Sequence, residues 1–262
     1  MGAYSFNGLP NKNLFLEIEG GNVQGWSHVR KFGKIFGLTT ALTPITITGL
    51  YQTPTSAQSL EIVSSDTNDT AAGSGCREVT IIGLNDSFVE TTVTCATDGT
   101  TPVAVTGTWR RVYRMYNSAS GTYGTSATSS HAGNIILRNS GAGVNWAQLY
   151  VDSGFGLGQT MIGCYTVPAG YTAYVYSSYL SVDSTKSVSA YFFQRPNADD
   201  TTAPYSAIRA VTSVELIGGI NYMGIDMPIG VYQAKTDIGW MAKTSASTAN
   251  VSVVFDIYLK QN

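Results

Sequence analysis

Three pairs of acidic residues lie close enough along the chain for acid–base chemistry: Glu17 with Glu19, Asp66 with Asp69, and Asp199 with Asp200. Hydrolysis of a glycosidic bond needs two carboxyl groups across a groove, one of them with a raised pKa. Glu17 and Glu19 would share one face of a short strand, but no sugar cleft is marked around them. A solvated strand edge is therefore favoured for this pair. Asp199 and Asp200 are expected to lie on an exposed loop.

The other chemical motifs are incomplete. Asp66-Thr-Asn-Asp69 offers oxygen ligands for a hard cation but lacks the glycine and distal glutamate of a calcium loop, so a hydrogen-bonded turn is preferred. The two histidines, His28 and His131, do not indicate a zinc site or a Ser-His-Asp triad. Gly154-Phe-Gly-Leu-Gly158 lacks the spacing of a dinucleotide-binding loop and predicts a flexible turn. No catalytic residue, cofactor, metal site or enzymatic activity is predicted.

The cysteines Cys76, Cys95 and Cys164 are odd in number and contain no Cys-x-x-Cys spacing. They are interpreted as buried free thiols of a protein made in a reducing cytosol. A bridge between Cys76 and Cys95 remains an alternative, because both lie in strand-like segments that can be neighbours.

Two groups of basic and aromatic residues are candidates for contact with a partner. The first contains Trp26, Arg30, Lys31, Phe32 and Phe36, and the second contains Trp109, Arg111, Tyr113 and Arg114. Trp, Tyr and Arg carry much of the energy of protein interfaces. For the first group a protein partner is preferred to nucleic acid, because no basic face elsewhere extends it. For the second, an amphipathic strand whose arginine stems cover apolar neighbours is an equally weighted alternative.

The composition limits which elements can position these residues. Of 262 residues only 12% are charged, whereas Ser and Thr number 57 and Gly 28, and the net charge is −2. These values exclude the intrinsic disorder that a high net charge produces, and they give no global attraction to nucleic acid or an acidic membrane. No apolar run is long enough for a transmembrane helix, and the N-terminus lacks a secretory signal of the usual form. A surface with little charge repulsion suits a chain packed among neighbours.

Apolar residues alternate with a period of two almost throughout, which predicts an all-β fold, an antiparallel β-sandwich or jelly-roll. Strands in the first half are expected at 59–64, 77–84, 88–95, 108–116 and 134–137. Strands in the second half are expected at 160–166, 172–183, 187–195, 211–217, 221–228, 235–243 and 251–260. Residues 121–133 are small and rich in hydroxyl groups, which predicts a long exposed loop.

Three segments are expected along the chain. Residues 1–57 are interrupted by glycines and predict an extended N-terminal arm, followed by a first β-rich half (58–158) and a second, jelly-roll-like half (159–262); the halves are compatible with one body. The arm carries apolar residues, so it is expected to lie along its own domain or a neighbouring subunit. Deletion of residues 1–45 is expected to leave a folded body.

Several spaced blocks of sequence resemble virion structural proteins of tailed bacteriophages, many of them from aquatic hosts. The blocks are Ser64-Ser-Asp-Thr-Asn-Asp-Thr-Ala-Ala-Gly-Ser-Gly-Cys-Arg-Glu-Val-Thr-Ile-Ile-Gly-Leu-Asn85, Glu90-Thr-Thr-Val-Thr94, Gly99-Thr-Thr-Pro-Val103, Trp109-Arg-Arg-Val-Tyr-Arg114, His131-Ala-Gly-Asn-Ile135 and Gly158-Gln-Thr-Met-Ile-Gly-Cys-Tyr-Thr-Val-Pro-Ala-Gly-Tyr-Thr-Ala-Tyr174. The resemblance covers roughly residues 50–195, and the segment before residue 45 departs from the family pattern. It implies a β-sandwich component of the virion without cofactor or enzymatic activity.

Within that family, a capsid decoration (cement) protein that binds and stabilises the shell of the major capsid protein is the leading expectation. It would lie on the outer capsid surface after synthesis in the host bacterial cytoplasm, as a homo-oligomer such as a trimer, with no nucleic-acid or membrane partner. The alternative is a tail-associated fibre or receptor-binding module that grips host carbohydrate through aromatic residues such as Tyr174, Tyr176 and Tyr179. A carbohydrate-active enzyme using Glu17 and Glu19 is a third, disfavoured hypothesis.

Overall fold

The computed structural model describes residues 13–123, 130–151, 158–223, 228–245 and 248–262. The fold is antiparallel β-structure with a single short helix among these residues, α1 (Leu14–Glu19), so the all-β prediction is confirmed. Within the described ranges, no helix is long and apolar enough to cross a membrane.

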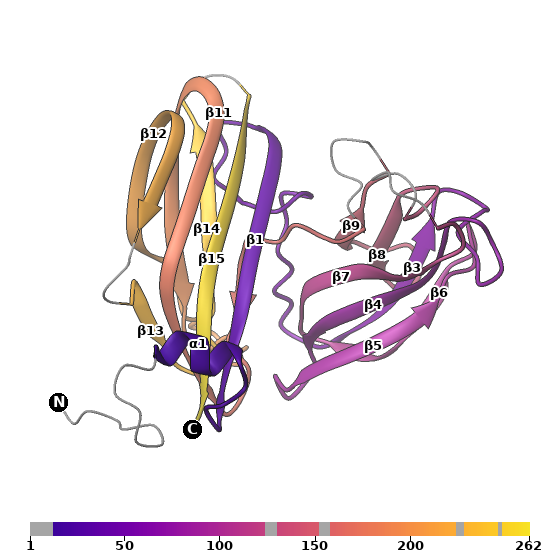
Figure 1. Cartoon of the computed structure of the whole chain (residues 1–262), viewed down its shortest axis with the longest axis horizontal. Coiled ribbons are helices and arrows are strands. Elements are labelled where there is room, and N and C mark those ends of the chain that lie inside the picture. Colours follow the sequence, from indigo (N-terminus) through magenta and orange to yellow (C-terminus); the bar gives the residue numbers. More distant parts are fainter. Residues whose placement is uncertain (1–12, 124–129, 152–157, 224–227, 246–247) are drawn as a thin grey trace.

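The strands form two lobes that stand side by side (Figure 1). The large lobe is an eight-stranded sheet in which β1, β15, β11, β14 and β10 follow one another, β12 and β13 pair with β11, and β2 pairs with β14. Its strands are β1 (Trp26–Leu38), β2 (Thr43–Pro44), β10 (Cys164–Thr166), β11 (Tyr171–Arg195), β12 (Arg209–Met223), β13 (Gly230–Tyr232), β14 (Asp237–Thr244) and β15 (Ala249–Gln261).

The small lobe lies between β2 and β10 in the sequence and contains two sheets. One has the order β6-β3-β8-β9 and the other the order β5-β4-β7. The strands are β3 (Gln58–Ser64), β4 (Cys76–Leu84), β5 (Glu90–Ala96), β6 (Val103–Trp109), β7 (Arg111–Ser120), β8 (Ile135–Asn139) and β9 (Asn145–Leu149). Apolar residues from both sheets, such as Ile62, Ile81 and Leu137, form one core between them.

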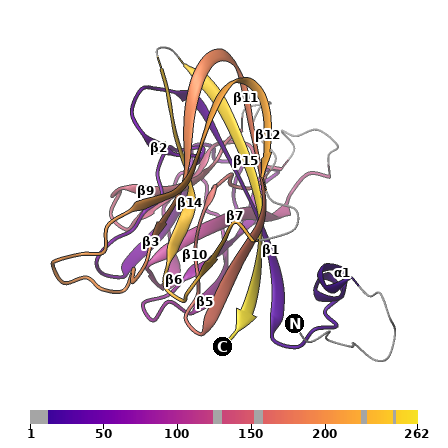
Figure 2. The same ribbon diagram turned by 90° about the vertical axis from the view of Figure 1, so that its left-hand side faces the viewer.

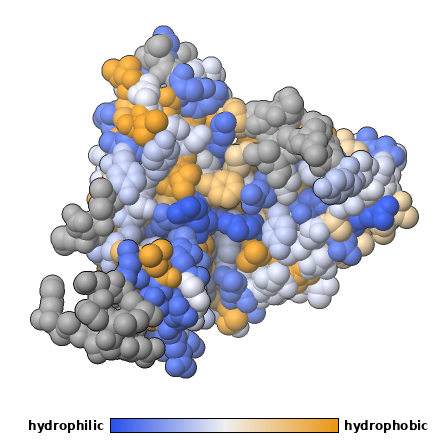
Figure 3. Space-filling model, in the orientation of Figure 1, coloured by the Kyte–Doolittle hydropathy of each residue, from blue (hydrophilic) through white to orange (hydrophobic). Residues whose placement is uncertain are grey.

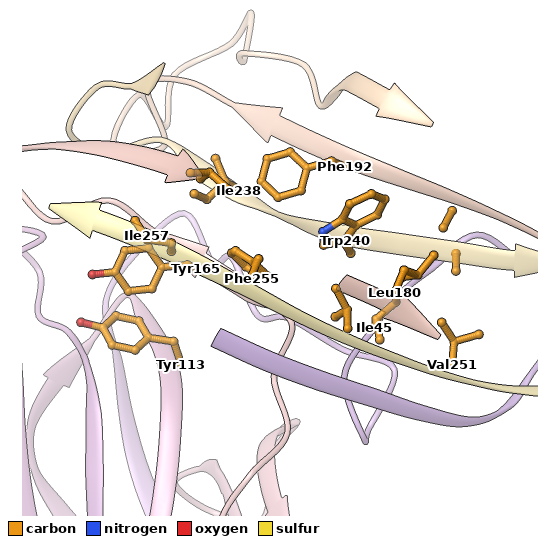
Figure 4. Packing of buried hydrophobic residues seen from close by; sticks show 14 of the residues in the cluster. Ile45, Tyr113, Tyr165, Leu180, Phe192, Ile238, Trp240, Val251, Phe255 and Ile257 are labelled. Atoms are coloured by element: carbon orange, nitrogen blue, oxygen red, sulfur yellow. The ribbon is translucent and has the colours of Figure 1, made fainter. Parts of the chain in front are cut away.

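The large lobe becomes a sandwich because its longest strand, β11, serves both layers. Residues 171–182 of β11 pair with β15 and residues 188–195 pair with β14. β11 and β12 arch together over the top of the lobe (Figures 1 and 2). The ring of Phe192 consequently lies 5.8 Å from that of Phe255 across the core. Figure 4 shows this packing, with Trp240 beside Phe192.

The alternation of β15 explains how the sequence forms this sandwich. Val251, Val253, Phe255 and Ile257 are buried in the core, whereas the residues between them are only partly buried. Successive side chains of a strand point to opposite faces, so the period of two read from the sequence marks one buried face. The strand ranges 172–183 and 187–195 are joined in one continuous strand.

The N-terminal segment is not an extended arm throughout. Residues Trp26–Leu38 form β1, which pairs with β15 from Trp26↔Lys260 to Ile35↔Val251. Ile35 and Leu38 belong to the buried core. The expectation that deletion of residues 1–45 leaves a folded body is therefore wrong, because the deletion would remove a core strand and expose the edge of β15.

The glycines of this segment have packing roles that the sequence does not reveal. A Cβ atom on Gly33 would lie 2.2 Å from the carbonyl oxygen of Ile45 and 2.4 Å from the backbone nitrogen of Gly163. Only glycine permits so close an approach of three backbone segments. Gly33 thus interrupts the apolar pattern of a strand without interrupting the strand.

The predicted strand 108–116 is also corrected. The chain leaves β6 at Trp109 and enters β7 at Arg111, and these two strands belong to different sheets. Arg110 lies at the turn, where its N–H donates to the carbonyl of Leu84. The change of sheet at Arg110 leaves no signal in the periodicity, because Trp109 at the end of β6 and Arg111 at the start of β7 are both buried.

Candidate functional site

The two lobes are joined by a buried ion pair between Arg111 of β7 and Asp237 of β14. Arg111 donates from Nε and Nη2 to the two carboxylate oxygens at 2.9 and 3.0 Å, and neither side chain is appreciably exposed. Nε of Arg195 donates to the same carboxylate at 2.9 Å, and the hydroxyl of Thr166 donates at 2.6 Å. A carboxylate so fully paired is suited to hold elements in register. This cluster fixes the lobes relative to one another.

A second cross-lobe contact is made by Lys31 of β1. Its ammonium group donates to the carbonyl oxygen of Tyr113 in β7, and the residue is only 2% exposed. Burial, together with the nearby charge of Arg114, lowers the pKa of Lys31 to about 7. In the opposite direction, Nη2 of Arg114 donates to the carbonyl oxygen of Arg30 at 3.0 Å. The two strands therefore exchange side-chain-to-backbone hydrogen bonds.

Tyr113 completes the junction. Its hydroxyl donates to the carboxylate of Glu90 at the start of β5, and its ring lies 4.7 Å from that of Tyr165 in β10. Burial raises the pKa of the Tyr113 hydroxyl well above its ordinary value, and the neighbouring Tyr165 and Glu90 add to this shift. Figure 4 shows Tyr113 and Tyr165 side by side at one end of the large-lobe core, with their ring planes inclined at 52°.

A pocket of about 220 Å³ lies beside these contacts, between β1 and the small lobe. It is lined by His28, Val29, Arg30, Lys31, Ile82, Glu90, Tyr113 and Arg114. Figure 3 shows hydrophilic side chains gathered where the two lobes meet. The pocket therefore joins basic groups of both lobes, and its Lys31 is withdrawn from solvent.

The outer face of the large lobe carries a network centred on Asp256 of β15. Its carboxylate accepts hydrogen bonds from His28 and Arg30 at 2.9 and 2.7 Å and from Ser177 at 2.6 Å. Burial alone would raise the pKa of the Asp256 carboxyl group, but these hydrogen bonds outweigh it and hold that pKa well below its usual range. Arg30 is thereby engaged by its own chain.

Aromatic residues on the same face also contact one another. The ring of Phe15 in α1 lies 4.8 Å from the rings of both Tyr176 and Tyr258, and Trp26 lies 5.4 Å from Tyr174. Figure 2 shows α1 beside the start of β1. Two of the three tyrosines expected to stack on a sugar therefore have an aromatic neighbour from the N-terminal segment.

The outer side of β12, in contrast, exposes apolar side chains to solvent. The 15-residue strand contains no fully buried residue. Tyr179, Ile217, Ile220 and Tyr222 are 39%, 73%, 61% and 54% exposed. Their neighbours on β11, such as Leu180 and Val182, are buried in the core, so these four side chains point outward. They are called the β12 face below.

The structure changes the interpretation of the predicted partner-binding residues. Lys31, Trp109, Arg111 and Tyr113 are buried inside the chain, so they do not form a surface open to another protein. Trp26, Arg30, Phe32 and Phe36 lie on the outer side of β1, and Arg114 lines the pocket. The predicted groups are thus divided between the junction and the outer face of the sheet.

The β12 face was not singled out from the sequence, although its strands were expected. The available signal was Ile217, which is out of phase with Val214 and Leu216 on the core side. Ile220 and Tyr222 have the same parity as Val214 and Leu216, and they reach the outer side because the alternation shifts at Gly218 and Gly219, after which Met223 packs against the core. Apolar residues on both sides of one strand indicate a second surface that needs cover.

The acidic pairs make structural contacts within the chain. Glu17 and Glu19 lie in α1, not on a strand, and Nδ2 of Asn22 donates to Glu17 at 2.9 Å. The hydrogen-bonded turn is confirmed, since the N–H of Asn68 donates to Oδ1 of Asp66 at 2.8 Å and the N–H of Asp69 donates to the carbonyl oxygen of Asp66 at 3.4 Å. Asp69 is also buried and accepts hydrogen bonds from the N–H groups of Cys76, Ala132 and Gly133. Asp199 is exposed, as expected, and pairs with Lys235 at 2.7 Å.

The histidine and cysteine candidates also lie inside the chain or make structural contacts. His131, expected in an exposed loop, is buried, and burial lowers its pKa while the carbonyl oxygen of Tyr150 contacts Nε2 at 2.8 Å. All three cysteines are free, and burial raises the pKa of Cys76 and Cys95 to about 12 and 11. Residues 154–157 of the glycine-rich stretch lie outside the described residues. Among the described residues, no group of three or more His, Cys, Asp or Glu could hold a metal ion.

No protein-family model and no curated protein matches the chain. Two solved structures, both of infectious bursal disease virus, are similar at 10% identity. The Gx-strain structure matches 90% of this chain and 76% of its own with a TM-score of 0.20, and the Gt-strain structure matches 89% and 75% with a TM-score of 0.19. Scores this low support neither a shared fold nor a shared function.

Proposed function

We propose that this chain is a non-enzymatic structural protein of a tailed-bacteriophage virion, specifically a capsid decoration (cement) protein that binds the shell of the major capsid protein. The spaced blocks between residues 50 and 195 support the virion assignment through their resemblance to such proteins. The β12 face supports an assembled state, and it is the observation that carries the proposal.

The β12 face is suited to protein contact because its apolar side chains are exposed among the described residues. Removing apolar surface from water stabilises an interface by about 25 cal/mol per Å², before the costs of ordering. Ile217, Ile220 and Tyr222 are each more than half exposed and lie on one strand. Contiguous exposed apolar groups of this kind mark interaction surfaces in soluble proteins.

The rigid junction between the lobes suits a clamp. Because the pair between Arg111 and Asp237 is buried and bidentate, the lobes resist rotation relative to one another. A decoration protein that touches two capsid subunits with a rigid body makes shell expansion depend on breaking those contacts. Sister copies of the chain would supply further contacts in a homo-oligomer such as a trimer.

The test is co-sedimentation of the purified full-length protein with undecorated shells of the phage that encodes it. The double variant Ile217→Asp/Ile220→Asp introduces two charges on the β12 face, and we expect shell binding to weaken by about a hundredfold or more. The matched control is Val144→Asp, which places a charge at a 60% exposed valine in the turn between β8 and β9. The control should bind like the natural protein.

Equal binding of the double variant and the natural protein would exclude the β12 face as the docking surface. Failure of the natural protein to bind shells at all would exclude the cement role. Circular dichroism of each variant verifies that the fold is retained before binding is compared.

A tail-associated receptor-binding module is the second candidate, favoured by one observation. Tyr179 and Tyr222 are direct cross-strand partners in β11 and β12, and both side chains are exposed. Two such rings form a platform on which a sugar ring can stack. Copy number in purified virions separates the candidates, since a shell protein is present in hundreds of copies and a tail module in tens or fewer. Binding of host surface glycan that is lost in Tyr179→Ala/Tyr222→Ala would favour the tail module.

A further inference from the structure

We propose that the pocket between β1 and the small lobe binds a tetrahedral oxyanion, such as the phosphate group of a small metabolite. The pocket residues from the large lobe are His28, Val29, Arg30 and Lys31, and those from the small lobe are Ile82, Glu90, Tyr113 and Arg114. The site is independent of the β12 face and of the proposed contact with capsid. Its ligand would bridge the two lobes.

The first support is the excess of positive charge around the pocket. Lys31, Arg30 and Arg114 line it against one carboxylate, that of Glu90. Glu90 accepts a hydrogen bond from the hydroxyl of Tyr113, which offsets part of its charge. Arg30 is paired with Asp256 on the outer face, so Lys31 and Arg114 are the two cations that a ligand would neutralise.

The second support is the number of unused hydrogen-bond donors. The ammonium group of Lys31 has three N–H donors, and within the described residues its one hydrogen-bond acceptor is the carbonyl oxygen of Tyr113. The guanidinium of Arg114 has five donors, of which one bonds to the carbonyl oxygen of Arg30. Lys31 is 2% exposed, so bulk water cannot solvate its remaining donors freely. An oxyanion in the pocket would accept hydrogen bonds from the remaining donors of both groups.

The third support is electrostatic. Burial lowers the pKa of Lys31 to about 7, and the charge of Arg114 acts in the same direction. The two cations therefore repel one another across the junction, and an anion between them would remove this repulsion. Binding of the anion would also favour the protonated form of Lys31.

The size of the pocket selects a small ligand. About 220 Å³ is several times the roughly 30 Å³ that one water occupies in the liquid, which is sufficient for a phosphate or sulfate group. Nucleic acid is not favoured, because the net charge of the chain is −2 and gives no general attraction to a phosphate backbone. The shared chemistry is the tetrahedral oxyanion, supplied either as free inorganic phosphate or as the phosphate of a nucleoside monophosphate.

The test is isothermal titration calorimetry of the full-length protein with sodium sulfate at constant ionic strength. Sulfate carries the same charge at every pH used, so any pH dependence reports on the protein. We expect saturable binding that weakens by about tenfold per pH unit above pH 7, as Lys31 loses its proton. Inorganic phosphate and a nucleoside monophosphate, titrated separately, identify which source binds more tightly.

Three variants and one control locate the site. Lys31→Met and Arg114→Met should each weaken sulfate binding by about tenfold or more, since each removes charge-assisted hydrogen bonds. Glu90→Gln should strengthen it, because the amide keeps an acceptor for Tyr113 and removes the repelling charge. The control is Lys34→Met, which removes the same charge from β1 at a lysine that lies over the ring of Phe36, outside the pocket.

Sulfate binding that does not saturate would overturn the proposal. So would equal weakening by Lys34→Met and Lys31→Met, since that result would indicate only a general charge effect. If Lys31→Met does not fold, Arg114→Met and Glu90→Gln still test the site from the small lobe. Their opposite effects on affinity would not follow from a change in stability.

Discussion

The junction between the lobes buries charged side chains, whereas the β12 face exposes apolar ones. This is the reverse of the usual distribution of side chains. The junction buries Lys31, Arg111 and Asp237 among hydrogen-bonding partners from both lobes. The β12 face exposes Ile217 and Ile220, which the chain leaves in contact with solvent. Charged groups are thus used inside the molecule to hold its parts together, and apolar groups are presented outside.

This contrast shows why residue type alone does not identify an interface. Arg and Tyr are enriched in contacts between proteins, and Arg111 and Tyr113 do lie in a contact, but the contact is between two lobes of one chain. Ile is less characteristic of interfaces, yet its exposure on β12 is what marks a surface that needs a partner. Burial decides between the two, and burial is set by the tertiary fold.

The largest effect expected from breaking the junction is that of Asp237→Ala. This variant leaves Arg111 and Arg195 without their carboxylate, and Arg111 is buried. Removal of one partner of a buried pair costs about 3–5 kcal/mol of stability, because an uncompensated charge remains. Urea unfolding should show a loss of this size.

The control for this prediction is Asp199→Ala, which breaks an exposed pair with Lys235. Such pairs contribute about 0–1 kcal/mol. A loss for Asp237→Ala as small as that of Asp199→Ala would mean that the junction is not held by this ion pair.

The next prediction compares one residue type in the two environments. Ile257→Ala removes a fully buried side chain from β15 and should lower the free energy of unfolding by about 2–5 kcal/mol. Ile220→Ala changes a side chain on the β12 face and should change it by less than about 0.5 kcal/mol in the isolated protein. Both values come from urea unfolding. A large loss for Ile220→Ala would show that the β12 face is covered within the isolated protein.

The third prediction concerns how the free energy of unfolding depends on pH in the natural protein and in Lys31→Met. The folded-state pKa of Lys31 is about 7 against an ordinary value of 10.5, so between these pH values the unfolded state binds more protons. Stability of the natural protein should therefore rise with pH across that window, by at most about 1.4 kcal/mol per unit from this group. Below pH 7 the full cost of burying the ammonium group remains.

The variant has no charge at this position, so it should lack this part of the pH dependence. Urea unfolding of both proteins from pH 6 to pH 10 measures the difference. Parallel pH profiles would mean that Lys31 keeps its ordinary pKa in the folded state.

Much of the fold was accessible from the sequence because one-sided burial leaves a period of two. Val251 to Ile257 illustrate this, and the strand was expected within two residues of its bounds. β1 was missed because Gly33, required by a close backbone approach, interrupts its apolar pattern. The junction could not be predicted, since Arg111 and Asp237 are 126 residues apart and no local pattern links them.

The smallest predicted effect concerns the N-terminal cover of the outer face. Phe15→Ala removes the ring that contacts Tyr176 and Tyr258, and loss of such aromatic contacts costs about 0.5–1.5 kcal/mol. The control is Leu16→Ala, its exposed neighbour in α1, which should cost less. Thermal unfolding measures both variants.

Because Phe15→Ala also uncovers Tyr176, a module that binds sugar through this tyrosine should gain affinity for glycan. Shell binding through the β12 face should not change. A gain in glycan binding would favour the tail module over the decoration protein. A loss of shell binding would show that the docking surface extends from β12 to α1.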